Sequence, residues 1–161
     1  MLDFEELYES HSADVYRFAF WLSGDRYDAE DITSETFIRA WTRNTTIRTE
    51  TLKAYLFTIA RNLYLEQRRK GKRRVAFEDV HTDHNAEPDK LVESRFELAR
   101  VKNIIQDLPE VDRAAFIMRV QHELPYTEIA RVLNLSVTNV KVKVHRVRKK
   151  MLASRLEKEV T

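Results

Sequence analysis

The sequence predicts an all-α protein of two small helical domains joined by a flexible acidic linker, and three observations lead to this prediction. Glycine and proline together supply 5 of the 161 residues, about 3% where ~12% is usual. The chain therefore lacks the turn residues that β-sheets and glycine-rich loops need. Apolar residues recur with helical spacing through most of the chain, and a polar, acidic stretch without that spacing divides it.

Three amphipathic helices are predicted within residues 1–74. The first begins after a cap at Asp3 and ends at Gly24. The second is expected to begin at a cap formed by Asp28, and the third extends over about 51–69. Each helix has one apolar face, so we expect the three to form one small bundle.

Residues 75–90 are predicted to be the linker, because FEDVHTDHNAEPD is acidic and shows no helical period. Residues 91–161 are predicted to form the second helical domain. Its four expected helices extend from about Leu91 to Leu108, from Pro109 to about His122, from Thr127 to Leu133, and onward from Ser136.

A helix-turn-helix is predicted between Tyr126 and Met151. Thr127 is expected to cap its first helix, Asn134 stands where the turn needs a positive φ, and Ser136 can cap the second helix. Residues at alternating spacings of three and four form a predicted buried stripe along the second helix: Val137, Val140, Val144, Val147 and Met151.

The side of this last helix that faces away from the valines is expected to lie in the DNA major groove. Asn139 and Arg146 can hydrogen-bond base edges or phosphates, and Val142 can contact a thymine methyl group. The residues that we expect to bind DNA here are Ser136, Thr138, Asn139, Lys141, Val142, Lys143, Arg146 and Lys149. An ordinary helical hairpin with a cationic surface is the alternative.

Charge is strongly segregated although the formal net charge is only +2. Residues 1–47 contain 10 acidic and 4 basic residues (net −6), and residues 48–74 contain 2 and 9 (net +7). Residues 75–98 contain 7 and 2 (net −5), and residues 125–161 contain 3 and 9 (net +6). Two basic surfaces flanked by acidic ones suit a protein that contacts a polyanion at two places, although such runs also occur as solvated helix faces.

The first basic segment ends in QRRKGKRR, residues 67–74. Upstream of it, the side of the helix away from the leucines carries an aromatic ring together with polar and cationic groups: Tyr55, Thr58, Arg61 and Asn62. Unstacked bases bind to such rings and amides while cations contact the backbone, so this face is typical of single-strand binding. Packing is the alternative role for Tyr55, and it is the role expected for Phe57.

Composition excludes several functions. The absence of cysteine removes disulfides, thiolate catalysis and cysteine-based zinc sites. No glycine-rich nucleotide loop or nucleophile–base set is found, so we expect no enzyme, no cofactor and no small-molecule substrate. The longest apolar run, 18–22, is too short to cross a membrane, and the acidic start of the chain is unlike a signal peptide, so a cytoplasmic protein is expected. His81 and His84 are interpreted as solvated residues without a metal.

Two stretches of the sequence resemble a known family. DAEDITSETFIRAW (28–41), followed by LKAYLFTIARNLYLEQRRK (52–70), is similar to region 2 of the extracytoplasmic-function group of bacterial sigma-70-type sigma factors. LPEVDRAAFIMR with LPYTEIARVLNLSVTNVKVKVHRVRKK, within 108–150, resembles region 4 of the same group. The two stretches occur in the family's order and cover most of the chain.

The resemblance implies a non-catalytic subunit that binds core RNA polymerase and recognises promoter DNA, with region 2 in 1–74 and region 4 in 91–161. It implies that region 4 reads the −35 element as duplex and that region 2 reads the −10 element as it melts, with loop 44–50 capturing an extruded base. The residues assigned to the −10 element are Tyr55, Arg61, Asn62, Arg68 and Arg69. The residues assigned to polymerase binding are Asp31, Ser34 and Glu35.

The resemblance also implies an anti-sigma factor as a partner, and a linker that threads the polymerase cleft. Two other functions fit the residues alone. One is a free-standing helix-turn-helix regulator, which would normally dimerise, although no dimerisation helix is evident after Leu156. The other is a helical adaptor with no role in nucleic-acid binding. Co-elution with core polymerase separates the first hypothesis from these two.

Overall fold

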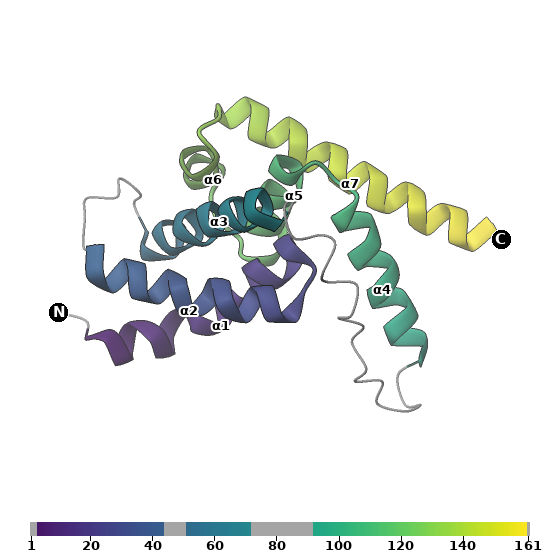
Figure 1. Cartoon of the computed structure of the whole chain (residues 1–161). Helices are drawn as coiled ribbons and strands as arrows, with labels where there is room; N and C mark the ends of the chain where they lie inside the picture. Colours follow the sequence, from purple (N-terminus) through teal and green to yellow (C-terminus); the bar gives the residue numbers. More distant parts are fainter. Residues whose placement is uncertain (1–2, 44–50, 72–91, 161) are drawn as a thin grey trace.

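The computed structural model describes residues 3–43, 51–71 and 92–160, and every secondary-structure element in these ranges is helical (Figure 1). The all-α prediction is therefore confirmed. The predicted linker and loop 44–50 lie outside the described residues, as do His81 and His84. In chain order the elements are α1 (Phe4–Ser23), α2 (Arg26–Arg43), α3 (Leu52–Gly71), α4 (Val92–Gln106), α5 (Glu110–Phe116), the π-helical turn η1 (Ile117–Gln121), α6 (Tyr126–Leu133) and α7 (Val137–Val160).

Both predicted ends of α1 are confirmed. The main-chain N–H of Glu6 donates to Asp3 Oδ1 at 2.8 Å, and the N–H of Asp3 donates back to the Glu6 carboxylate, which completes a capping box. Gly24 ends the helix in the left-handed region, with φ +74°. This conformation favours glycine because most side chains are strained at positive φ.

The predicted cap of α2 is wrong. The carboxylate that accepts hydrogen bonds at its start belongs to Asp25, whose Oδ1 accepts from the N–H groups of Tyr27 (2.7 Å) and Asp28 (3.0 Å). Asp28 instead lies in the first turn of the helix. Because Asp25 follows the left-handed Gly24 directly, the chain leaves α1 and enters α2 within two residues, and the earlier aspartate takes the capping position.

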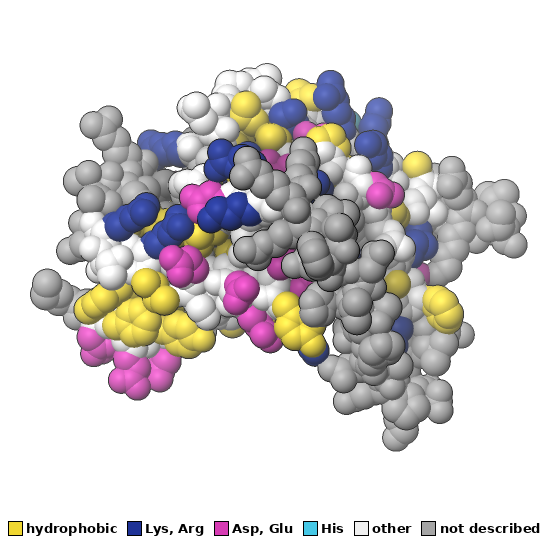
Figure 2. Space-filling view, in the orientation of Figure 1, with side chains coloured by type: hydrophobic (Ala, Val, Ile, Leu, Met, Phe, Trp, Pro, Cys, Tyr) yellow, Lys and Arg dark blue, Asp and Glu magenta, His cyan; other side chains and the backbone are white. Residues whose placement is uncertain are grey.

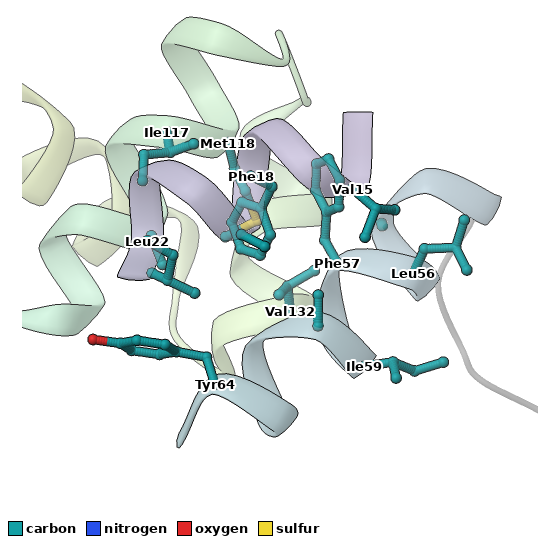
Figure 3. Packing of buried hydrophobic residues seen from close by; sticks show 14 of the residues in the cluster. Val15, Phe18, Leu22, Leu56, Phe57, Ile59, Tyr64, Ile117, Met118 and Val132 are labelled. Carbon is teal, nitrogen blue, oxygen red and sulfur yellow. The ribbon is translucent and has the colours of Figure 1, made fainter. Parts of the chain in front are cut away.

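Helices α1, α2 and α3 form the predicted bundle, with one apolar face of each turned inward. At its centre the rings of Phe18 and Phe57 stack with centroids 4.5 Å apart. Leu22, Ile32 and Phe37 are fully buried in the same apolar core. The packing role expected for Phe57 is therefore confirmed (Figure 3).

Two predictions for the second half are corrected. The single helix expected over 109–122 is divided into α5 and η1, in which the N–H of His122 donates to the carbonyl oxygen of Ile117, five residues earlier. Thr127 does not cap α6, because that helix begins at Tyr126 after Pro125 and has no side-chain cap. Proline has a backbone angle already suited to a helix start, so the first turn begins one residue earlier than expected.

The two halves of the chain pack against each other and share one core. Helix α6 packs on α3, and α4, α5 and η1 pack on α1. Buried residues of α1 and α3 such as Phe18 and Phe57 belong to the same apolar cluster as Met118 and Val132 of the second half (Figure 3). Periodicity predicted both helical domains, but it did not predict this contact. No helix within the described ranges combines the length and apolar content that a membrane crossing requires.

Candidate nucleic-acid interface

The helix-turn-helix has the local geometry that its sequence predicted. Asn134 lies in the left-handed region with φ 55° and ψ 48°, which turns the chain between α6 and α7. Ser136 caps α7, because its Oγ accepts from the N–H of Asn139 at 3.1 Å. Val140, Val144 and Val147 are buried beneath α7, and Val137 and Met151 are partly buried beside them. The opposite side of the helix is therefore left for solvent.

Most residues assigned to the −35 element lie on that exposed side. The exposed members are Ser136, Thr138, Asn139, Lys141, Val142, Arg146 and Lys149. Lys143 differs because its Nζ lies 3.2 Å from Asp112 Oδ1 on α5 and its side chain is mostly buried. The Nζ of Lys141 lies 5.6 Å from the centroid of the Tyr126 ring, which orients this cation at the start of the helix.

The residues assigned to the −10 element divide into two groups on α3. Asn62, Arg68 and Arg69 are exposed. Tyr55 is half-buried, its hydroxyl group has no hydrogen-bond partner among the described residues, and burial raises its pKa above the usual value. Arg61 is paired with Glu110 of α5, so these two side chains are engaged within the protein.

A hollow of about 770 Å³ opens beside α3, where α2 and α3 face the turn between α4 and α5. Five arginines line it: Arg39, Arg43, Arg68, Arg69 and Arg113. Figure 2 shows Lys and Arg side chains gathered over α2 and α3. Sequence analysis missed Arg39 and Arg43, although their spacing of four residues on α2 places both on one helix face.

Two acidic side chains, Glu66 and Glu110, also line the hollow and balance part of its positive charge. Arg39 donates to both carboxylate oxygens of Glu66 on α3, at 3.4 and 3.3 Å, and also to Glu35 at 3.4 Å. The hydrogen bonds from Arg39 hold the pKa of Glu66 below its usual value. The hollow therefore keeps a net positive lining that suits a phosphate backbone.

The residues assigned to polymerase binding lie together on α2. Asp31 and Ser34 are exposed, and Glu35 is partly buried beside Arg39. An apolar surface that sequence analysis missed continues from them. Its members are Phe4, Tyr8, Ile38 and Trp41, each 38–51% exposed. In Figure 2 this surface borders acidic side chains.

Comparisons with known proteins place these surfaces in a family. The family profile described as Sigma-70 region 2 matches residues 7–74, and the profile described as Sigma-70, region 4 matches residues 98–151. The chain is 30% identical over 156 residues to the ECF RNA polymerase sigma factor SigM of Bacillus subtilis, covering 92% of this chain and 93% of that protein. The chain belongs to the extracytoplasmic-function (ECF) sigma factors.

A second relative is longer than the present chain. The ECF RNA polymerase sigma factor SigE of Mycolicibacterium smegmatis is 31% identical over 158 residues, which are 94% of this chain and 61% of that protein. The chain thus spans about three-fifths of that relative's length. ECF sigma factors are non-catalytic initiation factors that give RNA polymerase its promoter specificity, and this is the function class of the chain.

Two solved structures have the same fold. The sigma factor RpoE of Bartonella quintana, in complex with the anti-sigma factor NepR, superposes with a TM-score of 0.71 at 26% identity, covering 91% of this chain and 92% of that one. CnrH, in complex with the cytosolic domain of CnrY, superposes with a TM-score of 0.70 at 24% identity, covering 96% and 87%. In the present chain, region 2 corresponds to α1–α3 and region 4 extends from within α4 into α7.

Proposed function

We propose that this sigma factor docks on core RNA polymerase through α2, reads the −35 element with α7 and holds one strand of the −10 element on α3. The observation that carries this proposal is the exposed face of α7. A left-handed Asn134 and a capping Ser136 set the direction of that helix, and its buried valines leave the basic side free. This arrangement is the one in which a recognition helix enters the major groove.

On α7, the exposed residues divide by their chemistry. Asn139 and Arg146 can hydrogen-bond base edges, and Val142, 41% exposed, can contact a thymine methyl group. Lys141, Lys143 and Lys149 are the phosphate contacts, with Lys143 first leaving Asp112. Each phosphate contact releases counterions, so promoter binding through α7 weakens as salt rises.

On α3, strand binding is supported by the arginine-lined hollow and by Asn62 beside it. Arg68 and Arg69 track the strand backbone, while the ring of Tyr55 and the amide of Asn62 meet unstacked bases. Extruding a base costs a few kcal/mol, which these contacts must offset. Arg61 joins this set once it is released from Glu110.

Polymerase docking is supported by the exposed acidic surface of α2. Asp31 and Ser34 point to solvent, and Glu35 is close by. An acidic surface next to apolar side chains suits a basic, amphipathic partner helix. The site of action is the compartment that holds the polymerase, the bacterial cytoplasm.

An anti-sigma factor is the second proposed partner. The sigma factor RpoE, which has the same fold at 26% identity, was solved in complex with the anti-sigma factor NepR. By this likeness, a protein that covers the polymerase-binding surfaces would hold the present chain silent.

Gel filtration with core polymerase tests the proposed function. The full chain should co-elute with the core enzyme in the absence of any inhibitor, and the mixture should start transcripts at promoters that share one pair of −35 and −10 sequences. Asp31→Lys should weaken co-elution at least tenfold because it reverses a charge at the centre of the docking surface. Asp107→Lys is the matched control, since it reverses the charge of an exposed aspartate that lies away from α2, in the turn between α4 and α5. Failure of the unaltered chain to co-elute contradicts the proposal.

A further inference from the structure

We propose that the arginine-lined hollow beside α3 is a binding site for a free nucleotide that carries two or three linked phosphates. The phosphate chain lies among the arginines of α2 and α3, and the nucleoside lies against the turn between α4 and α5. Such a nucleotide and the −10 strand exclude each other, a consequence that rests on the proposed role of α3 in strand binding.

The charge of the hollow is the first evidence. Its lining contains five arginines and two glutamates, so positive charge is in excess. Arg43, Arg68 and Arg69 are exposed, and within the described ranges none of them pairs with a carboxylate. They belong to the Lys and Arg side chains that gather over α2 and α3 (Figure 2). A guanidinium binds a phosphate through two parallel hydrogen bonds, so three such groups around one hollow suit a ligand with several phosphates.

The buried guanidinium of Arg113 is the second evidence. Its side chain lines the hollow, yet the residue is only 4% exposed. Its hydrogen bonds go to uncharged oxygen atoms, namely the Tyr64 hydroxyl group and the carbonyl groups of Leu22, Ile105, Gln106 and Leu108. No carboxylate pairs with it in the part of the chain that the structure describes. A buried charge without a counter-charge is costly, and an anion in the hollow supplies that counter-charge.

Two of these cations converge on a single atom. The hydroxyl oxygen of Tyr64 accepts from Arg113 Nη1 at 3.0 Å and from Arg68 Nη1 at 2.7 Å. Two like charges are therefore held close together on one neutral acceptor, and they repel each other. Arg68 has five N–H donors and uses one of them here, so a phosphate can bind to the others and offset the repulsion.

The size and the remaining lining of the hollow favour a nucleotide over inorganic phosphate. Its volume of about 770 Å³ lies within the range of small-molecule sites. Besides the arginines it is lined by the apolar Leu65, Leu108 and Pro109 and by the amide of Asn62. Apolar side chains hold the face of a base, and an amide can hydrogen-bond its edge. The hollow thus combines concentrated positive charge with a surface for a nucleoside.

A nucleotide in the hollow affects the strand site directly. Asn62, Arg68 and Arg69 line the hollow and are also the exposed residues assigned to the −10 element. One set of side chains cannot hold both ligands. At a nucleotide concentration ten times its dissociation constant, the apparent affinity for the strand should fall about tenfold.

Calorimetric titration of the full chain with ATP, without divalent cations and at low ionic strength, tests the site. One ATP should bind per chain and should raise the melting temperature. Arg43→Gln and Arg68→Gln should each weaken ATP binding about tenfold, because each removes a charge-assisted contact. Arg155→Gln is the matched control, since Arg155 is exposed on α7 and does not line the hollow. Tripolyphosphate, which lacks the nucleoside, should bind at least tenfold more weakly than ATP.

Three results would overturn the nucleotide site. The first is the absence of both binding heat and a rise in melting temperature with ATP. The second is equal affinity for ATP and tripolyphosphate, which would mean that the hollow attracts anions without recognising a nucleoside. The third is an equal loss in Arg155→Gln, which would mean that ATP binds to surface charge in general. Circular dichroism verifies that each variant keeps its helices.

Competition with a strand tests the exclusion. ATP should displace a fluorescein-labelled 20-nucleotide single strand from the chain, measured by anisotropy, and Arg43→Gln should require about tenfold more ATP. A strand that stays bound at saturating ATP overturns the exclusion. A chain that binds ATP but no strand retains the nucleotide site and contradicts the proposed role of α3. Because the calorimetric titration contains no DNA and no polymerase, its result does not depend on the proposed function.

Discussion

Arg113 of α5 donates a hydrogen bond from Nη1 to the main-chain carbonyl oxygen of Leu22 on α1, 2.6 Å away and 91 positions earlier in the sequence. The same buried guanidinium also donates to three carbonyl oxygens at and just after the end of α4: those of Ile105, Gln106 and Leu108. The last carbonyl groups of a helix lack intrahelical partners. One side chain therefore completes the end of α4 and ties the second half of the chain to the first.

Replacing Arg113 should lower the free energy of unfolding substantially. Arg113→Met keeps the length of the side chain but leaves several buried carbonyl groups without a donor, so we expect the free energy of unfolding to fall by about 3–5 kcal/mol. Urea denaturation followed by circular dichroism measures it. Arg148→Met, at an exposed position of α7, is the control and should change stability by less than about 0.5 kcal/mol. Equal midpoints for the two variants would contradict this role for Arg113.

The buried His122 should make the stability of the folded chain sensitive to acid. Burial lowers its pKa to about 4, against an ordinary value of 6.5, and the nearby Asp14 only partly offsets this. Lys53 of α3 and Arg17 of α1 also face it and lower its pKa further. The neutral imidazole is therefore the form that fits between the aromatic rings of α1 and α3.

The sign of the pH effect follows from the lowered pKa. A group whose pKa is lower in the folded chain contributes fully above its unfolded value of 6.5 and loses that contribution as pH falls toward 4. Between pH 7.5 and pH 5 the loss should be about 2 kcal/mol. Unfolding curves at the two pH values measure it, and His122→Gln should remove most of the difference. If the His122→Gln variant keeps the full pH dependence of stability, another group is responsible for it. The partly buried His11 is the next candidate.

Short sequence patterns predicted the features that depend on a few neighbouring residues, such as helix ends and turns. Gly24 and Asn134 were both assigned to helix ends because few residues adopt positive φ, and both lie there. Asp28 was misassigned as a cap because two aspartates compete within one turn, and only the backbone path chooses Asp25. Local patterns of this kind extend over a few residues, so they specify helices and turns.

Contacts between the halves could not be predicted in the same way. Arg61 and Glu110 are 49 positions apart, and the sequence predicts a DNA contact for Arg61 but gives no sign that Glu110 pairs with it. Tyr55 has an aromatic ring that suits either strand binding or packing, and periodicity left both roles open. Whether such a residue is exposed depends on which helix packs over it. The spacing of apolar residues within one helix does not predict that contact.

The turn between α1 and α2 should tolerate no side chain at Gly24. A Cβ atom there would lie 2.7 Å from Gln106 Cδ and would require a positive φ. Gly24→Ala should therefore lower the free energy of unfolding by about 1–2 kcal/mol and displace the amide that bonds Trp21. Gly71→Ala is the matched control, because a Cβ at that position meets nothing within 4 Å. Similar melting temperatures for both variants would argue against strain at Gly24.

The exposed face of α7 gives the last prediction. Arg146 is exposed at the centre of that face, and its guanidinium can contact a guanine edge or a phosphate. Arg146→Ala should weaken promoter binding by about 1–3 kcal/mol and so reduce −35-dependent transcription roughly tenfold. Co-elution with core polymerase should be unchanged. Arg155→Ala, further along the same helix and beyond the region 4 match, is the control and should behave as the unaltered chain. Loss of polymerase binding in the Arg146 variant would mean that this face of α7 contacts the enzyme, and the DNA-reading surface would then have to lie on another side of the helix-turn-helix.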